Sequence, residues 1–178
     1  ECGDTVTVAE KMDRVGKKIL ATGNGRCNLM NTGAPRYPGN AAFAADVLSH
    51  CGAEAQKAFW EHLGLRLRQE EAGRVYPVSS QASSVLDALR LQLTALHVRV
   101  VTGASITALH RENDGWTALS ADGQQFRANR VIISGGGCAQ PKLGSDGSAL
   151  RLLTNLGCPA TPFAPALTQI ITDSTPIK

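Results

Sequence analysis

A β-branched run that ends in three consecutive glycines, RVIISGGG at residues 130–137, constrains the fold of this chain most. Such a run predicts a buried strand, and the glycines after it allow close backbone approach to a ligand. Open α/β sheets place their ligands at the carboxyl ends of strands. The following residues predict a helix from Ser145 or Asp146 to Leu156, closed by Gly157. Its first N–H groups suit a phosphate or a polar ring, although Ser and Asp are also the ordinary caps of a helix in a βα loop.

The rest of the chain alternates strand and helix patterns. The expected elements are a strand at 5–9 that ends in Glu10, one or two helices over 40–64 with Gly64 as cap, a hairpin over 65–78 that turns near Gly73, a helix capped by Ser79 or Ser80 that runs to Leu96, and strands at 98–101, 106–111, 116–121 and 125–133. Asp-Gly pairs between the last three strands indicate tight hairpins. This order predicts an α/β fold in which a layered sheet carries an inserted β-meander.

Composition narrows the class of protein. The chain has 178 residues, of which 43% are hydrophobic, and this suits one globular domain. A net charge of +3, with no run of five positive residues and only 4% aromatic residues, argues against a nucleic-acid partner. Five cysteines without a C-x-x-C pair predict neither a zinc site nor a disulfide framework. We therefore expect a cytoplasmic protein with no signal peptide and no membrane span.

Glu10 follows the first strand, where a carboxylate has a known use. In a dinucleotide-binding βαβ unit, an acid at the end of the second strand hydrogen-bonds the adenosine ribose hydroxyls. The glycine-rich phosphate loop of such a unit lies about twenty residues earlier. Here that position falls before residue 1, so we expect the chain to begin inside the motif. The alternative is that Glu10 is a solvated strand end.

The segment GKKILATGNGRCN, residues 16–28, resembles a loop that approaches a phosphate. Its glycines let backbone N–H groups approach an anion, its cations attract one, and Asn28 both donates and accepts hydrogen bonds. It does not match G-x-G-x-x-G, because Asn28 stands where the last glycine belongs. The alternative is a tight turn flanked by surface cations.

Three blocks together resemble a known family. They are VAEKMDRVGKKILATGNGRCNLMN, GRVYPVSSQASSVLDAL and VIISGGGCAQPKLGSDGSALRLLTNLGCPATPFAPAL, and they span nearly the whole chain. They are similar to the bacterial YhiN/BaiN-type flavoproteins, which are described as NAD(P)/FAD-dependent or aminoacetone-oxidase-like oxidoreductases. One departure is Ser134, which precedes the glycines where the family often has Ala-Thr-Gly-Gly.

The resemblance implies a partial FAD/NAD(P)-binding Rossmann-like domain over residues 1–160. The helical segment 40–96 and a β-meander at 98–128 would lie within it, and 161–178 would connect to a second domain. FAD would be bound without a covalent bond, with NAD(P)H as a candidate electron donor. The residues that the resemblance assigns to the cofactor are Glu10, Lys17, Lys18, Gly23, Gly25, Arg26, Cys27, Asn28, Ser105, Ile106, Gly135 and Gly136. Since the N-terminal glycine motif and the C-terminal part of the family are absent, we expect this chain alone to bind FAD poorly.

The sequence predicts an FAD-dependent oxidoreductase that acts on a small molecule, but it identifies neither a catalytic residue nor the oligomeric state. In such enzymes the cofactor performs the redox step. Cys27 beside Arg26 suits a redox partner of the flavin, and a packed small residue is the alternative that we favour. The block containing Arg74, Tyr76, Pro77 and Ser79 is assigned to the substrate side. The alternative functions are a nucleotide-binding module without redox chemistry and a protein-interaction domain built on residues 40–64.

Overall fold

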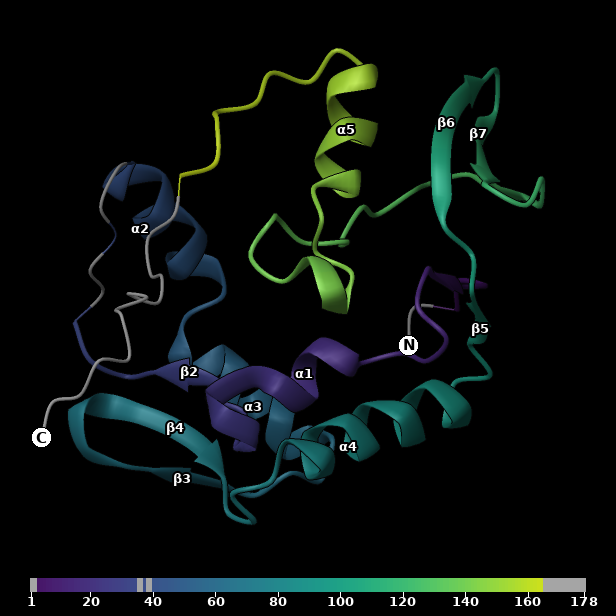
Figure 1. Ribbon diagram of the computed structural model, residues 1–178. Coiled ribbons are helices and arrows are strands. Elements are labelled where there is room, and N and C mark those ends of the chain that lie inside the picture. The colour runs from purple at the N-terminus through teal and green to yellow at the C-terminus, as the bar shows by residue number, and fades with distance from the viewer. Residues whose placement is uncertain (1–2, 35–36, 38–39, 165–178) are drawn as a thin grey trace, which may run out of the picture. The chain divides into compact units, whose positions relative to one another are not determined.

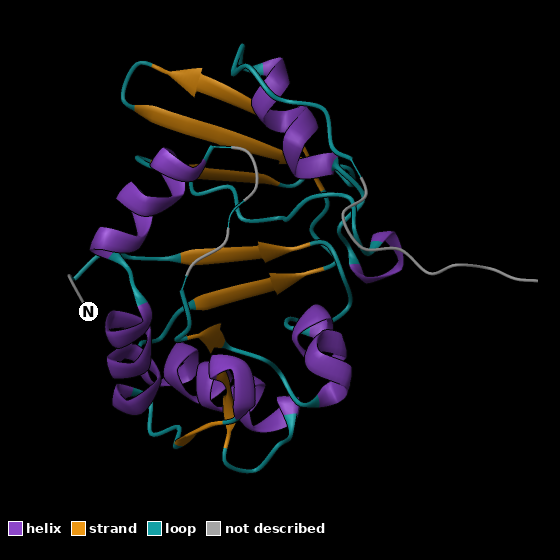
Figure 2. Ribbon diagram, turned by 90° about the vertical axis from the view of Figure 1, so that its left-hand side faces the viewer, coloured by secondary structure: helices purple, strands orange, loops and turns teal. Residues whose placement is uncertain are grey.

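The computed structural model describes residues 3–34, 37 and 40–164. The chain divides into two compact units, Glu1–Ser105 and Ile106–Lys178, and each is described by itself. Figure 1 labels the elements, and Figure 2 distinguishes the helices from the strands. The fold is mixed α/β, as the sequence predicts, because both units combine helices with short sheets.

A parallel pair of strands occupies the first unit. Strand β1 (Thr7–Glu10) pairs with β5 (Arg99–Thr102), with Thr7 opposite Arg99 and Glu10 opposite Thr102. Parallel strands need a long crossover, and here the described residues between them hold four α-helices and a small antiparallel sheet. The strand expected at 98–101 therefore pairs with the first strand of the chain and not with the meander. The alternation of residue types within one strand does not determine which other strand it pairs with.

The small sheet has the order β2-β4-β3, all antiparallel, with β2 (Met30–Asn31), β3 (Leu67–Gln69) and β4 (Arg74–Pro77). The hairpin expected over 65–78 is confirmed. Its turn contains Ala72 and Gly73 at φ 57° and 73°, a left-handed region that glycine adopts at no steric cost. The side chain of Asn31 donates a 3.0 Å hydrogen bond to the Ala72 carbonyl and so holds the turn against β2.

The helices of the first unit are α1 (Lys17–Ala21), α2 (Ala41–His50), α3 (Ala53–His62) and α4 (Ala82–Ala95). The sequence predicts one or two helices over 40–64, and the structure has two, with Gly64 just past α3 at φ 79°. The cap expected at Ser79 or Ser80 is wrong, because Gln81 is the N-cap of α4. Ser79 instead accepts a hydrogen bond from the Gln81 backbone N–H at 3.3 Å, which stabilises the turn before the helix.

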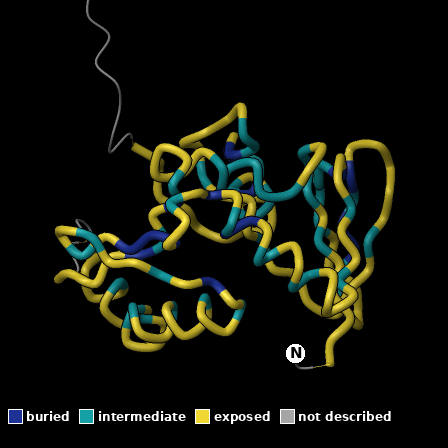
Figure 3. The backbone as a smooth tube through the Cα atoms, turned by 90° about the horizontal axis from the view of Figure 1, so that it is seen from below, coloured by how far each residue is buried: buried dark blue, intermediate teal, exposed yellow. Residues whose placement is uncertain are grey.

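A compact core holds the first unit together. It consists of Cys27, Leu65, Ala82 and Val85, with Ile19, Trp60 and other partly buried side chains around it. Gly16 brings α1 against α4, because a Cβ atom there would lie 2.2 Å from a Leu86 methyl carbon. Figure 3 shows that the buried stretches of the chain are short and separated by exposed and intermediate ones. The core thus joins residues 16–28 to the hairpin and to the first turns of α4.

The second unit begins with the expected meander of β6 (Ile106–Glu112), β7 (Gly115–Ser120) and β8 (Gln125–Ala128). Helix α5 (Ser148–Asn155) follows and ends before Gly157, which has φ 82°. It begins later than the sequence predicts, with Gly147 as N-cap. The Asp146 carboxylate accepts a 3.1 Å hydrogen bond from the Ser148 N–H, so the acid caps the helix from outside it.

The strand expected at 130–133 is not formed. These residues have no regular secondary structure, and the Ile132 side chain is 90% exposed. A strand exists only through hydrogen bonds to a neighbour, and none of the described strands pairs with this run. Its β-branched composition alone therefore does not make it a buried strand. Residues 161–164 have no helix or strand, and the remainder of the connector expected at 161–178 lies outside the described residues.

Across the residues that the structure describes, none of the helices combines the length and the apolar character that a membrane crossing requires. Among the same residues, no three His, Cys, Asp or Glu side chains are grouped to hold a metal ion.

Candidate cofactor-binding site

Glu10 and Ser105 lie at the same end of the parallel pair in the first unit. The backbone carbonyl of Glu10 accepts a 2.9 Å hydrogen bond from Ala104, the buried residue before Ser105. The Glu10 carboxylate is partly buried, and its Oε1 accepts a 2.8 Å hydrogen bond from the Met12 N–H. The carboxyl end of β1 thus holds an oriented carboxylate, and the backbone of Glu10 is bonded to the residue before Ser105.

The glycine loop, residues 22–28, has an unusual backbone. Gly23, Asn24, Gly25 and Cys27 all have positive φ, at 53°, 53°, 81° and 57°. The N–H of Arg26 bonds to the Gly23 carbonyl at 3.1 Å, and the N–H of Cys27 bonds to the Thr22 carbonyl at 3.0 Å. The successive left-handed residues Gly23 to Gly25 make a tight turn, and these two backbone hydrogen bonds close it. The first residues of the loop, 22–25, are exposed.

Strand β4 is hydrogen-bonded to the end of this loop. Leu29 donates a backbone hydrogen bond to Val75 at 2.9 Å. With its amide oriented to match its neighbours, Asn28 donates to the carbonyls of Val75 and Met30 at 3.3 and 3.1 Å. Gly23 lies so close to the turn that a Cβ atom would stand 2.8 Å from the Asn28 backbone nitrogen. The G-R-C-N and R-V-Y-P blocks of the sequence are thus one structural piece.

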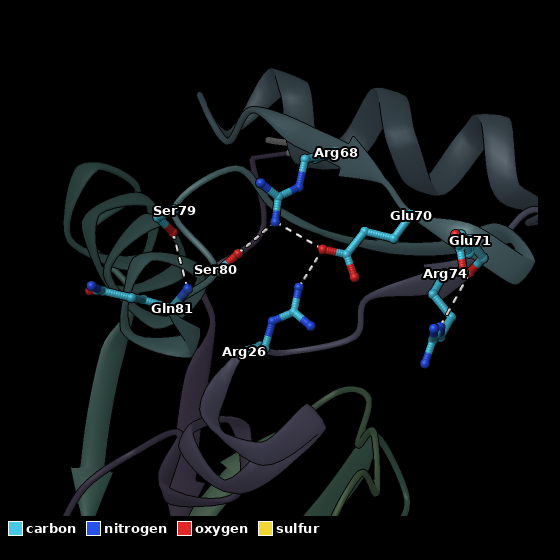
Figure 4. Close-up of polar contacts among 8 residues, drawn as sticks. All are labelled: Arg26, Arg68, Glu70, Glu71, Arg74, Ser79, Ser80 and Gln81. Atoms are coloured by element: carbon cyan, nitrogen blue, oxygen red, sulfur yellow. Dashed lines mark hydrogen bonds and ion pairs between the residues drawn. The ribbon is translucent and has the colours of Figure 1, made fainter.

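Arg26 joins the loop to the hairpin through two contacts. Its guanidinium lies over the Tyr76 ring, 4.1 Å from the ring centre. It also donates a hydrogen bond to Glu70 Oε1 at 2.5 Å, while Arg68 donates to the same oxygen at 2.8 Å. Arg68 reaches the Ser80 hydroxyl at 2.9 Å as well. Figure 4 shows the two arginines approaching Glu70 from different elements, with the Arg74–Glu71 contact separate from them.

This geometry sets the charge state of Glu70. The hydrogen bond from Arg26, followed by that from Arg68, holds the pKa of Glu70 below its usual range, against the opposing effect of desolvation. We predict that Arg26→Gln raises the pKa of Glu70 more than Arg68→Gln does, because Arg26 is the larger cause. Carboxyl ¹³C NMR titration of the three proteins measures this. Equal pKa values of Glu70 in the two variants would contradict the prediction that Arg26 has the larger effect.

The sign of the pH effect follows from the same shift. Because the folded state lowers the pKa of Glu70, the ion pairs contribute stability above the unfolded pKa of the carboxyl, near its ordinary value of 4.5. That contribution is lost as the pH falls through the lower, folded pKa.

Other predicted residues have different surroundings. Lys17 pairs with Asp13 one turn earlier, and the hydrogen bond from Lys17 lowers the pKa of Asp13. Lys18 lies in the last turn of α1. The Cys27 side chain is 6% exposed and packs in the core, so the interpretation as a packed small residue is confirmed for the thiol. Tyr76 and Pro77 are buried as well, and the Tyr76 ring contacts the loop at Arg26.

The second unit holds the last predicted loop. Gly135 passes against α5, where a Cβ atom would lie 2.8 Å from that of Ala149. Gly136 has φ 82°, and together with Ser134, Leu153 and Phe163 it lines a hollow of about 380 Å³. Ile106 opens β6. Whether this loop and the residues of the first unit meet on one cofactor stays a prediction.

Sequence reasoning missed Glu70 and Arg68. A signal was present: Arg68 and Glu70 are two residues apart at the end of a strand pattern, so both point to one face. Nothing in the sequence indicated that Arg26, more than forty residues earlier, would join them.

A parallel pair joined by a long crossover, with an acid at its carboxyl end, is a feature of Rossmann-type α/β proteins. The chain belongs to the HI0933-like family, since the family model described as HI0933-like protein Rossmann domain matches residues 1–165. The family resemblance inferred from the sequence blocks is thereby confirmed.

Curated relatives agree with this placement. The chain is 42% identical over 168 residues to the 3-dehydro-bile acid delta(4,6)-reductase of Clostridium scindens, an alignment that covers 93% of this chain and 41% of that protein. It is 23% identical over 172 residues to a ribosomal RNA dihydrouridine synthase of Haemophilus influenzae, which covers 90% of this chain and again 41% of the relative. The chain thus spans about two fifths of the length of these relatives.

Among solved structures, the chain is similar to the open form of NikD, described as an unusual amino acid oxidase essential for nikkomycin biosynthesis. The TM-score is 0.41 at 16% identity, with 87% of this chain and 48% of that chain covered.

Proposed function

We propose that this chain forms the FAD-binding part of an FAD-dependent oxidoreductase. The observation that carries the proposal is the position of Glu10, the last residue of β1, at the carboxyl end of a parallel pair of strands. An acid at this position in a Rossmann-type unit accepts hydrogen bonds from the adenosine ribose. The name of the 42% identical relative, a reductase, supports the oxidoreductase class.

The residues present fit such a cofactor. Among the described contacts of Glu10, only Oε1 is used, by the Met12 N–H, so Oε2 remains for a ribose hydroxyl. The exposed glycines of the loop, Gly23 and Gly25, would let a ligand approach the backbone closely. Lys17 and Lys18 would contribute positive charge from α1.

FAD would supply hydride transfer between an electron donor and the substrate. The residues of this chain would hold the adenosine and orient the cofactor. We infer NAD(P)H as the donor and a small molecule as the substrate, in line with the reductase relative. The relatives named for ribosomal RNA are only 23% and 21% identical, and the chain shows no dense positive run that would favour RNA.

We predict that Glu10→Gln weakens FAD binding about tenfold or more, because a charged acceptor is replaced by a neutral one of the same shape. The hydrogen bond to Met12 survives in this variant, so the fold is retained. The matched control is Glu54→Gln on an exposed turn of α3. Quenching of flavin fluorescence measures the affinity, in a protein of the relatives' full length that carries these residues.

Two outcomes would contradict the proposal. One is a full-length protein that takes up no FAD, and the other is unchanged affinity in Glu10→Gln. Titration of the 178-residue chain alone tests the separate expectation that it binds FAD poorly. Anaerobic addition of NADH or NADPH then distinguishes an oxidoreductase from a nucleotide-binding module without redox chemistry, because only the former bleaches the flavin absorbance.

A further inference from the structure

We propose that Glu70 is a positioning residue that locks the glycine loop in place through Arg26. We call the group Arg26, Arg68, Glu70 and Tyr76 the latch. As far as it concerns the cofactor, this inference rests on the proposed function. The part that concerns the loop itself does not.

The latch acts on the loop directly because Arg26 is part of it. The Arg26 N–H closes the turn onto Gly23, and the next residue, Cys27, is buried in the core. The guanidinium is held from two directions, by the Tyr76 ring at 4.1 Å and by the Glu70 carboxylate. Fixing this side chain therefore fixes the backbone between the exposed glycines and the core.

Glu70 differs from an isolated surface ion pair. Two arginines from different segments donate to one oxygen, Oε1, and the Glu70 side chain is only 25% exposed. Arg68 extends the network to Ser80, just before α4. Isolated exposed pairs contribute little, whereas such a network holds its members in one geometry. The network thus ties the loop, the hairpin and the turn before α4 together.

The latch also changes the role expected for Arg26. Its charge is already paired with Glu70, and its planar face is covered by Tyr76. We therefore assign it to loop position and not to direct attraction of a pyrophosphate. The competing interpretation is that Glu70 occupies an anion site, which a phosphate or carboxylate of the ligand would take over. The two interpretations predict opposite effects of Glu70→Gln on FAD affinity: the latch predicts weaker binding, and the anion site predicts tighter binding.

The first experiment measures opening of the glycine loop without any cofactor. In the 178-residue chain with Cys2, Cys51, Cys138 and Cys158 replaced by serine, Cys27 is the remaining thiol. Its rate of reaction with a disulfide reagent reports opening of the loop. We expect Glu70→Gln to raise this rate about fivefold, the size of a lost ion-pair contribution. The matched control, Arg74→Gln, leaves the rate unchanged, because the hydrogen bond described for the Arg74 side chain goes to the Glu71 carbonyl and not to Glu70 or Arg26.

The dependence on urea separates loop opening from unfolding. Local opening exposes little surface, so the rate rises weakly with urea, whereas global unfolding gives the full denaturant slope. A raised rate with a weak slope supports the latch. An unchanged rate, or a rise with the full slope, would overturn it.

The second experiment uses FAD in the full-length protein that carries these residues. The latch predicts that Glu70→Gln weakens FAD binding. The double variant Glu70→Gln/Arg26→Gln should bind FAD no more weakly than either single variant, because both substitutions remove the same Arg26–Glu70 contact. Tighter FAD binding in Glu70→Gln would favour the anion site and reject the latch. If the wild-type protein binds no FAD, the proposed function fails, while the thiol rates still decide the latch.

Discussion

Replacing Tyr76 with alanine is expected to lower the free energy of unfolding by about 3–5 kcal/mol. Tyr76 is 6% exposed and lies on β4, the central strand of its sheet. Its ring supports the Arg26 guanidinium on one side and lies near Gly23 of the loop. The substitution removes a buried ring and leaves a cavity that the rigid hairpin fills poorly. Urea unfolding of both proteins, followed by tryptophan fluorescence, measures the loss.

Tyr76→Phe is the matched control. It keeps the ring and its contact with Arg26, and the described hydrogen bonds do not include the Tyr76 hydroxyl. We expect a change within about 0.5 kcal/mol. A Tyr76→Ala loss below about 1 kcal/mol would show that the ring is not a structural support, since buried aromatic residues cost several times more.

Local patterns predicted the local elements well. The hairpin over 65–78 forms because strand-like residues flank Gly73, which tolerates positive φ. The meander forms because Asp114-Gly115 and Asp122-Gly123 supply turns between alternating strands. In each case a few adjacent residues contain the whole physical cause.

Pairing over long distances was not predictable in the same way. The strand at 99–102 pairs with residues 7–10, more than ninety positions away, and its own composition does not specify that partner. The run at 130–133 shows the reverse case. It has strand composition but pairs with none of the described strands, because a ladder depends on a neighbour as well as on propensity.

The cofactor roles of the candidate site stay predictions. Glu10 was predicted from the end of the first strand pattern and Ser105 from the family resemblance. In the structure Glu10 ends β1, and Ser105 follows the paired strand β5. Residues that act through side-chain contacts were harder to assign. Arg26 was expected at an anion, yet it pairs with Glu70 and covers Tyr76. Residue type gives the charge of a side chain but not the partner that the fold brings to it.

Replacing Gly23 with alanine is expected to destabilise the first unit by about 2–4 kcal/mol, as the sum of two costs. The first is the left-handed conformation, φ 53°, which an L-residue adopts at a cost of about 1–2 kcal/mol. The second is a collision, because the added Cβ atom would lie 2.8 Å from the Asn28 backbone nitrogen. A backbone atom cannot swing away as a side chain does, so the loop must shift.

Gly25→Ala separates the two costs. Gly25 is also left-handed, at φ 81°, but the nearest atom to its added Cβ would be the Leu20 carbonyl oxygen at 3.9 Å. This variant carries only the conformational cost of about 1–2 kcal/mol. Urea unfolding of both variants should therefore give a larger loss for Gly23→Ala. Because the shift moves Asn28, which is tied to Val75 and Met30, Gly23→Ala should also weaken FAD binding more than Gly25→Ala does. Equal losses of unfolding free energy in the two variants would mean that the backbone shifts at little cost. The loop would then be too flexible to orient a cofactor.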